Sequence, residues 1–231
     1  VNTVNFDLSG STEYIGYNSS REFEGEMPEV ILYDRKLTDA ERMRVNSYLG
    51  LKYGISVGHD IVSSDGSVLW GSSAMATYHN MVTGIGRDDN SALDQRQSQN
   101  LDSRALVAMG LGSIAANNAA NANSFSADKS FMIWGNNGQR LGAVSYSGAA
   151  DSRVARVWKI KETGTVGTVE ISVPATTGFT HLFINSSDNS FASGNVEVAL
   201  TSDGSGNMTA TYNFSDGDFF TFGPGLPVPG G

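Results

Sequence analysis

The stretch GIGRDDNSALDQRQS, residues Gly84–Ser98, decides how the rest of the chain is interpreted. Its first residues are predicted to form a strand, in which successive side chains point to opposite faces. Gly84 and Gly86 then share one face, and their missing side chains leave room there for an aromatic ring or a crossing backbone. We expect Trp134 or Trp158 to fill that space. The pattern indicates close packing along a strand that ends in an acidic turn.

Short apolar runs recur along the whole chain, separated by Gly, Asn, Ser and Asp. SFMIWG (Ser130–Gly135) and RVARVWKIKE (Arg153–Glu162) are rich in β-branched and aromatic residues, which favour strands. Long helices do not alternate with these runs, so a parallel α/β fold is not expected. The regular spacing is typical of antiparallel sandwiches. We therefore predict an all-β fold, an antiparallel and jelly-roll-like β-sandwich.

One segment departs from this pattern and is predicted to form an amphipathic helix over residues 39–53. Thr38 and Glu41 match a capping box at its start, because each side chain can bond the backbone N–H of the other. Gly54 is placed to end the helix, since glycine accepts the left-handed conformation that follows a last helical turn. The side chains expected to share one face are Val45, Tyr48, Leu49 and Lys52.

Composition excludes several classes of partner. The formal net charge is -9, so the basic face that nucleic-acid binding requires is not expected. No run approaches the roughly eighteen apolar residues of a membrane helix, so membrane insertion is not expected either. Cysteine is absent from all 231 residues, which excludes disulfides and thiolate metal sites and favours an exported protein over a cytosolic one.

The acidic turn offers oxygen atoms of the kind that calcium prefers. The candidate calcium ligands are Asp88, Asp89, Asn90 and Asp94. The EF-hand pattern is not met, because Leu93 stands where that loop needs glycine and Gln99 stands where it needs glutamate. A sandwich loop can still hold calcium through carboxylates and backbone carbonyls. The alternative is a turn in which Asx side chains cap backbone amides.

Arg156 offers a second interpretation of the same carboxylates. It alternates with Val154 and Trp158 along a predicted strand and so is expected to be buried. A buried guanidinium needs a carboxylate partner, because an unpaired charge in the interior is very costly. We expect an ion pair between Arg156 and Asp88, with Asp89 as the other candidate. This structural pair competes directly with calcium.

Two further sets of residues carry side chains that are common in catalytic sites. Glu22, Glu24 and Glu26 alternate along REFEGEMPE, and alternate strand positions can bring two carboxyl groups to the separation that glycoside hydrolysis needs. A solvated acidic face is the preferred interpretation. The three histidines, His59, His79 and His181, lack the spacing of metal ligands. We therefore expect no enzymatic activity, with a weak glycoside hydrolase as the alternative.

The segment GEMPEVILYDRKLTDAERMRVNSYLGLKYGI, Gly25–Ile55, carries a family resemblance. It resembles the closing strand and C-terminal helix of the concanavalin A-like, laminin-G-like jelly rolls of bacterial secreted multidomain proteins. In that family an apolar strand leads into a Ser/Thr-capped helix that ends in Tyr-Gly. The resemblance covers Gly16 to Val57. It implies that residues 1–57 are the last strands and the helix of a jelly roll.

Later segments carry a second resemblance, to a poorly characterised domain that often follows laminin-G-like domains in very large bacterial surface and adhesin-like proteins. The segments are GHDIVSSDGSVLW, TGIGRDDNSALDQRQSQN, ADKSFMIWG, ARVWKIKETG and DGDFFTFG. They imply a β-sandwich module over residues 58–223, followed by a Pro/Gly linker at 224–231. They also imply an extracellular or cell-surface location, and no established reaction.

Together these features predict a non-catalytic extracellular module that acts in adhesion, assembly or spacing, with calcium as a possible stabilising ion. Its expected partners are neighbouring domains, or copies of the same protein, that pair through exposed strand edges. A glycan or a peptide is the expected ligand if one is bound. The alternative function is a carbohydrate-binding, lectin-like module of the concanavalin A-like type.

Overall fold

The computed structural model describes residues 17–18, 21–145 and 152–224. The chain divides into two compact units, Val1–Lys36 and Leu37–Gly231, and each is described by itself. The boundary expected between residues 57 and 58 thus falls between Lys36 and Leu37, since the helix belongs with the strands that follow it. Of the linker expected at 224–231, all but Pro224 lies outside the described residues.

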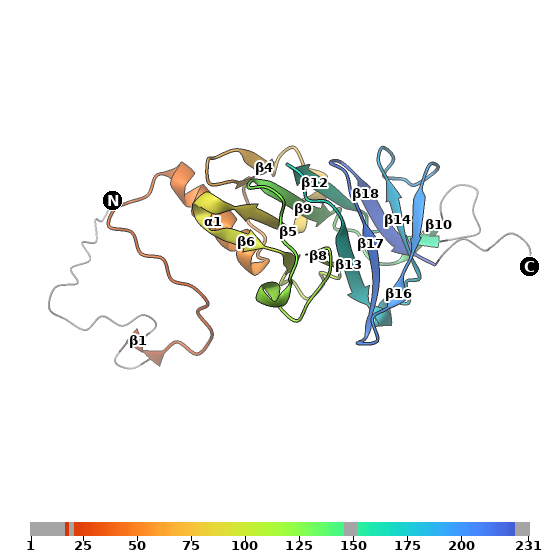
Figure 1. Ribbon diagram of the computed structural model, residues 1–231, viewed down its shortest axis with the longest axis horizontal. Helices are drawn as coiled ribbons and strands as arrows, with labels where there is room; N and C mark the ends of the chain where they lie inside the picture. Colours follow the sequence, from red (N-terminus) through yellow and green to blue (C-terminus); the bar gives the residue numbers. More distant parts are fainter. Residues whose placement is uncertain (1–16, 19–20, 146–151, 225–231) are drawn as a thin grey trace, which may run out of the picture. The chain divides into compact units, whose positions relative to one another are not determined.

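The second unit is built on two antiparallel sheets, which confirms the predicted all-β sandwich (Figure 1). The seven-stranded sheet has the order β15 (Val196–Ala199), β14 (His181–Asn185), β18 (Phe219–Gly223), β12 (Trp158–Thr163), β9 (Ser130–Asn136), β5 (Asn80–Asp88) and β6 (Leu93–Gln95). The five-stranded sheet has the order β16 (Thr201–Ser202), β17 (Asn207–Tyr212), β13 (Val169–Pro174), β8 (Ala108–Leu111) and β7 (Gln97–Gln99).

Short elements complete the description. Two-stranded pairs are formed by β1 (Tyr17–Asn18) with β2 (Arg21–Glu22), β3 (Ile61–Val62) with β4 (Val68–Trp70), and β10 (Ala143–Ser145) with β11 (Ser152–Val154). Single 3-10 turns are η1 (Ala76–Tyr78), η2 (Asp89–Ser91), η3 (Asn118–Ala120) and η4 (Ala175–Thr177). Within the described residues, no helix combines the length and apolar character needed to cross a membrane.

Strand β9 lies in the middle of the fold and is buried on both faces. Because side chains alternate along a strand, Met132 and Trp134 face one way and Phe131 and Ile133 the other. The first pair joins the core between the two sheets. The second pair joins a core with residues of α1, β3 and β4, such as Leu51, which cover the outer face of the seven-stranded sheet. A strand covered on both sides explains the continuous apolar run SFMIW.

The glycines of β5 provide the space that their alternation predicted. A Cβ atom at Gly86 would lie 2.2 Å from a ring carbon of Phe131, and one at Gly84 would lie 2.8 Å from the Ile133 side chain. The predicted fillers, Trp134 and Trp158, were wrong. Both belong to the core between the sheets, on the opposite face of β9 and its neighbour, so they cannot reach the glycine face.

Helix α1 (Asp39–Tyr53) begins and ends as predicted. The Thr38 hydroxyl accepts a hydrogen bond from the Glu41 N–H, the Glu41 carboxylate accepts one from the Thr38 N–H, and Gly54 follows with φ of 65°. Its most buried residues are Ser47, Gly50 and Leu51, however, rather than the predicted face of Val45, Tyr48, Leu49 and Lys52. The small residues at 47 and 50 allow a close approach, and the Ser47 hydroxyl accepts a bond of 3.0 Å from the Val62 N–H.

In the first unit, the segment EVILYD does not form the expected strand. The described residues 23–33 have no strand, and their large apolar side chains are exposed. Valine, isoleucine and tyrosine favour strands, but a strand needs a partner to satisfy its backbone N–H and C=O groups. The sequence therefore has the composition of a sheet strand in a segment that is assigned to no sheet among the described residues.

Candidate functional site

The acidic turn lies between β5 and β6, at one end of the seven-stranded sheet. Strand β5 ends at Asp88, the single 3-10 turn η2 follows, and Ala92 takes a left-handed conformation with φ of 52° before β6 begins. This tight reversal lets β6 pair with β5, with Asp88 opposite Leu93 and Arg87 opposite Asp94. The turn thus directs the side chains of Asp88 and Asp89 towards different partners.

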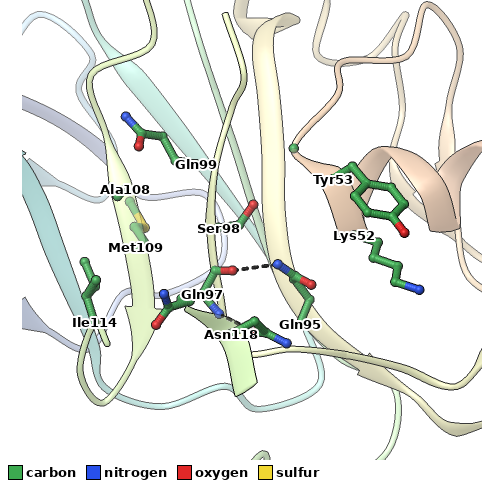
Figure 2. Close-up of a pocket in the computed structure, with 11 residues that line it drawn as sticks. Lys52, Tyr53, Gln95, Gln97, Ser98, Gln99, Ala108, Met109, Ile114 and Asn118 are labelled. Carbon is green, nitrogen blue, oxygen red and sulfur yellow. Dashed lines mark hydrogen bonds between the residues drawn. The ribbon is translucent and has the colours of Figure 1, made fainter. Parts of the chain in front are cut away.

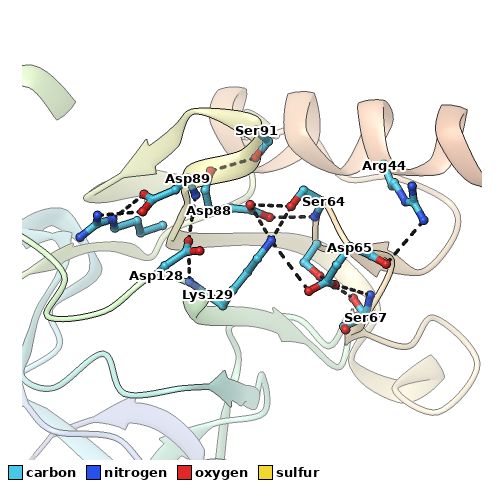
Figure 3. A network of polar contacts seen from close by, with 11 residues as sticks. Arg44, Ser64, Asp65, Ser67, Asp88, Asp89, Ser91, Asp128 and Lys129 are labelled. Atoms are coloured by element: carbon cyan, nitrogen blue, oxygen red, sulfur yellow. Dashed lines mark hydrogen bonds and ion pairs between the residues drawn. The ribbon is translucent and has the colours of Figure 1, made fainter.

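Asp88 is the buried centre of a polar network (Figure 3). The residue is 1% exposed, and its carboxylate accepts hydrogen bonds from the Ser64 N–H at 2.8 Å and the Ser64 hydroxyl at 2.7 Å. The Lys129 ammonium donates a third bond at 2.6 Å. Burial opposes the charged form, but these bonds outweigh it, so the pKa of Asp88 is lowered. The carboxylate is held ionised in a structural role.

Lys129 connects this network to the hairpin of β3 and β4. Its ammonium contacts the Ser64 hydroxyl and lies 4.0 Å from the Asp65 carboxylate. Asp65 in turn accepts bonds from the Ser63 hydroxyl at 2.5 Å and the Ser67 N–H at 2.9 Å, which hold its pKa well below the usual range. Three segments that are distant in the sequence therefore meet around one ammonium group.

The other carboxylates of the turn are also paired with cations from the chain. Arg87 binds Asp89 through two bonds, of 2.7 and 2.9 Å, and Arg96 binds Asp94 at 2.6 Å. These two pairs, with Phe125 and neighbouring residues, line a hollow of about 490 Å³. Each pair is partly exposed, so its positive and negative charges balance at the surface of the hollow.

The four predicted calcium ligands are not brought together as one site. Within the described residues, no group of three or more acidic or histidine side chains is arranged to hold a metal ion. The carboxylates of Asp88, Asp89 and Asp94 each have a lysine or arginine partner instead. Asn90 lies in the exposed turn η2 between them. Calcium binding at these residues stays a prediction, and their geometry favours charge balance by side chains.

The predicted ion pair between Arg156 and Asp88 was wrong. Arg156 is 7% exposed and donates to the backbone carbonyls of Gln139 at 2.7 Å and Arg104 at 3.0 Å. Burial lowers the pKa of its guanidinium. Asp88 and Arg156 stand near opposite ends of β9, because Arg87 pairs with Ser130 and Trp158 pairs with Asn136. Seven strand residues span about 20 Å, so the two side chains cannot meet.

A polar pocket of about 390 Å³ lies between the end of α1 and strands β6 to β8 (Figure 2). Sequence reasoning missed it, although DQRQSQ held the signal. Alternation along β6 and β7 places Gln95, Gln97 and Gln99 on one face, and all three line the pocket. Asp94 and Arg96 lie on the other face and line the charged hollow instead. The same six residues thus separate a neutral surface from a charged one.

The glutamates and histidines with a catalytic alternative lie in separate parts of the described chain. Glu24 and Glu26 are exposed in the first unit, and the side chain of Glu22 lies outside the described residues. The histidines serve local structure. His79 accepts a bond from the Trp70 indole at 3.0 Å, and His181 lies 3.7 Å from the Glu197 carboxylate. None of these glutamates and histidines lines the polar pocket or the charged hollow.

The fold defines an antiparallel β-sandwich whose larger sheet carries a helix and a hairpin on its outer face. Residues 41–218 match the family model "Domain of unknown function (DUF8202)", which covers more than half of the chain. The protein therefore belongs to this family. The matched range begins inside α1 and ends just before β18, so it lies within the second unit. Neither a curated protein nor a solved structure matches the chain.

Proposed function

We propose that this protein is a non-catalytic module of a large extracellular protein of a bacterial surface, where it joins neighbouring domains or copies into an assembly. The observation that carries the proposal is the apolar segment, which we define as residues 23–33, FEGEMPEVILY. Its large apolar side chains are Phe23, Met27, Val30, Ile31, Leu32 and Tyr33. They are between 37% and 69% exposed. Such a run is expected to be covered in the working protein.

The apolar segment has the composition of a strand that joins a sheet supplied by a neighbour. Val30, Ile31 and Tyr33 have strong strand preference, and an added strand gains both backbone hydrogen bonds and apolar burial. Pro28 precedes them, and proline is common at the start of a strand. Within the described residues of the first unit, the sheet is a single two-stranded pair, β1 with β2, and an isolated pair of strands is only marginally stable. The composition of the segment therefore fits an added strand better than a segment that stays exposed to water.

The edges of the two sheets in the sandwich are not all covered to the same degree. Next to β6, the Asn118 side chain bonds the Asp94 carbonyl at 2.8 Å and the Arg96 N–H at 2.6 Å. Next to β7, the backbone of Gly54 lies against Gln99, and its carbonyl accepts a bond of 2.9 Å from the Leu101 N–H. The chain itself thus occupies both of these edges.

The opposite edge of the five-stranded sheet is β16. Both of its residues, Thr201 and Ser202, are exposed, and within the described residues its outer side pairs with no strand. A heterologous contact between the apolar segment of one copy and β16 of the next would join copies head to tail. We propose β16 of a second copy as the edge that accepts the apolar segment.

The proposed location and the lack of catalysis have separate support. A chain of 231 residues without cysteine suits an oxidising environment in which free thiols are avoided. The charged groups of the acidic turn are engaged in pairs that stabilise the fold. Family membership supplies no reaction that would argue against a structural role.

Light scattering across a concentration series tests assembly. We expect the average mass of the wild-type chain to rise with concentration, and Leu32→Lys to remain monomeric. The matched control is Leu101→Lys, which changes an equally exposed leucine on the sandwich. A wild-type chain that stays monomeric at all concentrations would overturn the proposal, as would equal effects of the two variants.

Disulfide trapping tests the accepting edge. Because the chain has no cysteine, a mixture of Leu32→Cys and Ser202→Cys chains can form heterodimers only through the introduced residues. We expect oxidation to trap more of these dimers than a mixture of Leu32→Cys with Ser126→Cys, an exposed loop position. Equal trapping with both partners would refute β16 as the acceptor while leaving assembly itself to the scattering result.

A further inference from the structure

We propose that the polar pocket between α1 and strands β6 to β8 binds a neutral pyranose unit of a glycan. This proposal is independent of assembly through the apolar segment. Its walls include the side chains of Tyr53, Gln95, Gln97, Gln99, Ile114 and Asn118 (Figure 2). A volume of about 390 Å³ is in the range of small-molecule sites. The residues in these walls decide which class of molecule fits.

Neutral amides dominate the polar part of the pocket. The lining contains three glutamines and one asparagine, and no carboxylate. The one charged group, Lys52, is held against its own helix, because its ammonium donates to the Tyr48 hydroxyl at 2.6 Å and lies 4.9 Å from the centre of the Tyr48 ring. The pocket therefore offers donors and acceptors without a dominant charge, which favours a neutral polar ligand over an ion.

Two of the amides are fixed and form a rigid wall. Gln97 donates to the Ala115 carbonyl at 2.9 Å and accepts from the Ala115 N–H at 2.8 Å. Asn118 is held by the Asp94 carbonyl and the Arg96 N–H. Side chains that are held in place before binding lose little entropy when a ligand arrives. This part of the pocket is preorganised.

The other two amides retain capacity for a ligand. Gln95 uses its nitrogen to bond the Gln97 carbonyl at 2.7 Å, and Gln99 uses its nitrogen to bond the Ala105 carbonyl at 3.3 Å. Neither Oε1 atom accepts a hydrogen bond from any described residue. Each of these oxygens can accept from a hydroxyl, and each amide nitrogen has a second hydrogen to donate. Sugar hydroxyls both donate and accept, so they match this pair of groups.

Apolar surface lies beside the amides. Tyr53 and Ile114 line the pocket, and the backbone N–H of Leu101 donates to the carbonyl of the lining residue Gly54. Leu101 is 72% exposed, the highest value among the large apolar side chains described. A pyranose has hydroxyls at its edge and C–H groups on its faces. It can therefore contact amides and an aromatic or aliphatic surface at once.

An extended peptide fits this place less well. A peptide that adds a strand needs the backbone N–H and C=O groups of an open edge. At this edge, Asn118 already occupies the Asp94 carbonyl and the Arg96 N–H, and also accepts from the Gln97 N–H at 3.2 Å. A compact ligand that uses side-chain amides does not require those groups. The geometry thus favours a sugar over a peptide strand.

An array of neutral glycans, followed by calorimetry with the best-bound oligosaccharide, tests the proposal. We expect Gln99→Ala and Tyr53→Ala to lower the affinity at least about tenfold, since each removes contacts worth roughly 1 kcal/mol or more. Gln139→Ala, which removes an exposed glutamine outside the pocket, is expected to bind as the wild type does. The Gln99 side chain is itself exposed, so its loss should leave the melting temperature unchanged.

Several results would overturn the site. The first is that the wild-type chain retains no neutral glycan. The second is that Gln99→Ala and Gln139→Ala bind a retained glycan equally well, which would place the site elsewhere. The third is that the chain binds extended peptides, with loss on Gln99→Ala, and no glycan, which would show that the pocket takes a peptide after all.

Discussion

The Lys129 ammonium lies 2.6 Å from a carboxylate oxygen of Asp88, and the two groups differ greatly in their burial. The side chain of Asp88 is 2% exposed and that of Lys129 is 27% exposed. Lys129 thus neutralises a carboxylate that water cannot reach, from a position that keeps part of its own surface in solvent. The pair joins the end of β5 to the residue before β9, and Ser64 ties both to the neighbouring hairpin.

Removal of the lysine should destabilise the fold strongly. Lys129→Met leaves the Asp88 carboxylate buried with only the bonds from Ser64, and we expect a loss of about 2–3 kcal/mol in the free energy of unfolding. Urea denaturation measures it. The control is Arg87→Met, which breaks the exposed pair with Asp89 and should leave the urea midpoint almost unchanged. Equal losses of unfolding free energy in the two variants would show that the burial of Asp88 does not determine how much stability is lost.

Acid should weaken the same network. The pKa of Asp88 is lowered in the folded state, because the bonds from Lys129 and Ser64 outweigh burial. A group with a lowered folded pKa stabilises the fold above its unfolded pKa, near 3.8, and loses this contribution as pH falls through the folded pKa. We therefore expect the melting temperature to decrease as the pH is lowered below about 4.

Substitution of the carboxylate isolates its part of that acid response. Asp88→Asn has no proton to gain at this position, so its melting temperature should be lower than that of the wild type at pH 7 but should fall less between pH 5 and pH 3, a range of roughly one unit either side of the unfolded pKa. Thermal melts at matched ionic strength measure both curves. Parallel curves would mean that other carboxylates cause the acid loss.

Chelation should leave the stability unchanged. Asp88, Asp89 and Asp94 are balanced by Lys129, Arg87 and Arg96, so calcium would have to displace a cation that is already bound. A ligand raises the melting temperature only if it binds the folded state better than the unfolded one. We expect equal melting temperatures in excess calcium and in excess chelator, with sodium chloride added to equal ionic strength. A calcium-dependent rise that Asp89→Asn removes would restore the calcium interpretation of the turn.

Local features were predicted well, since the residues that form them are close in sequence. The capping box of Thr38 and Glu41, and the end of the helix at Gly54, depend on contacts within one turn. The sandwich followed from the density of strand-forming residues. The prediction that Gly84 and Gly86 share a closely packed face followed from alternation along the strand. The residues that fill this face, Phe131 and Ile133, are set by the pairing between strands.

Long-range partners could not be predicted in this way. Lys129 is 41 residues from Asp88, and nothing near either residue marks the contact. Arg156 was expected to pair with a carboxylate, but the backbone carbonyls of Gln139 and Arg104, which lie in two separate loops, satisfy it instead. The glutamines at 95, 97 and 99 did carry a local signal, the alternation of neutral and charged residues. That alternation alone does not predict a pocket, because the opposite wall comes from the end of α1, in a distant part of the sequence.

The glycine face of β5 gives the sharpest test of the packing between strands. A methyl group at Gly86 would lie 2.2 Å from a ring carbon of Phe131. This contact lies in a buried core, where the paired strands β5 and β9 have little room to separate. We expect Gly86→Ala to cost about 2–3 kcal/mol in the free energy of unfolding, as overpacking does. Gly58→Ala is the control, because nothing lies within 4 Å of its Cβ position. That change should stay within about 0.5 kcal/mol of the wild type.

A double-mutant cycle then assigns the cost of Gly86→Ala to the Phe131 ring. Phe131→Ala removes the Cγ, Cδ1 and Cε1 atoms that the new methyl group would meet and keeps an apolar Cβ in place. If the clash causes the loss, Gly86→Ala should cost at least about 1 kcal/mol less in the Phe131→Ala background than in the wild type, a coupling expected only between residues in contact. Strictly additive losses would mean that the methyl group disturbs the β5 backbone and not the ring of its neighbour on β9.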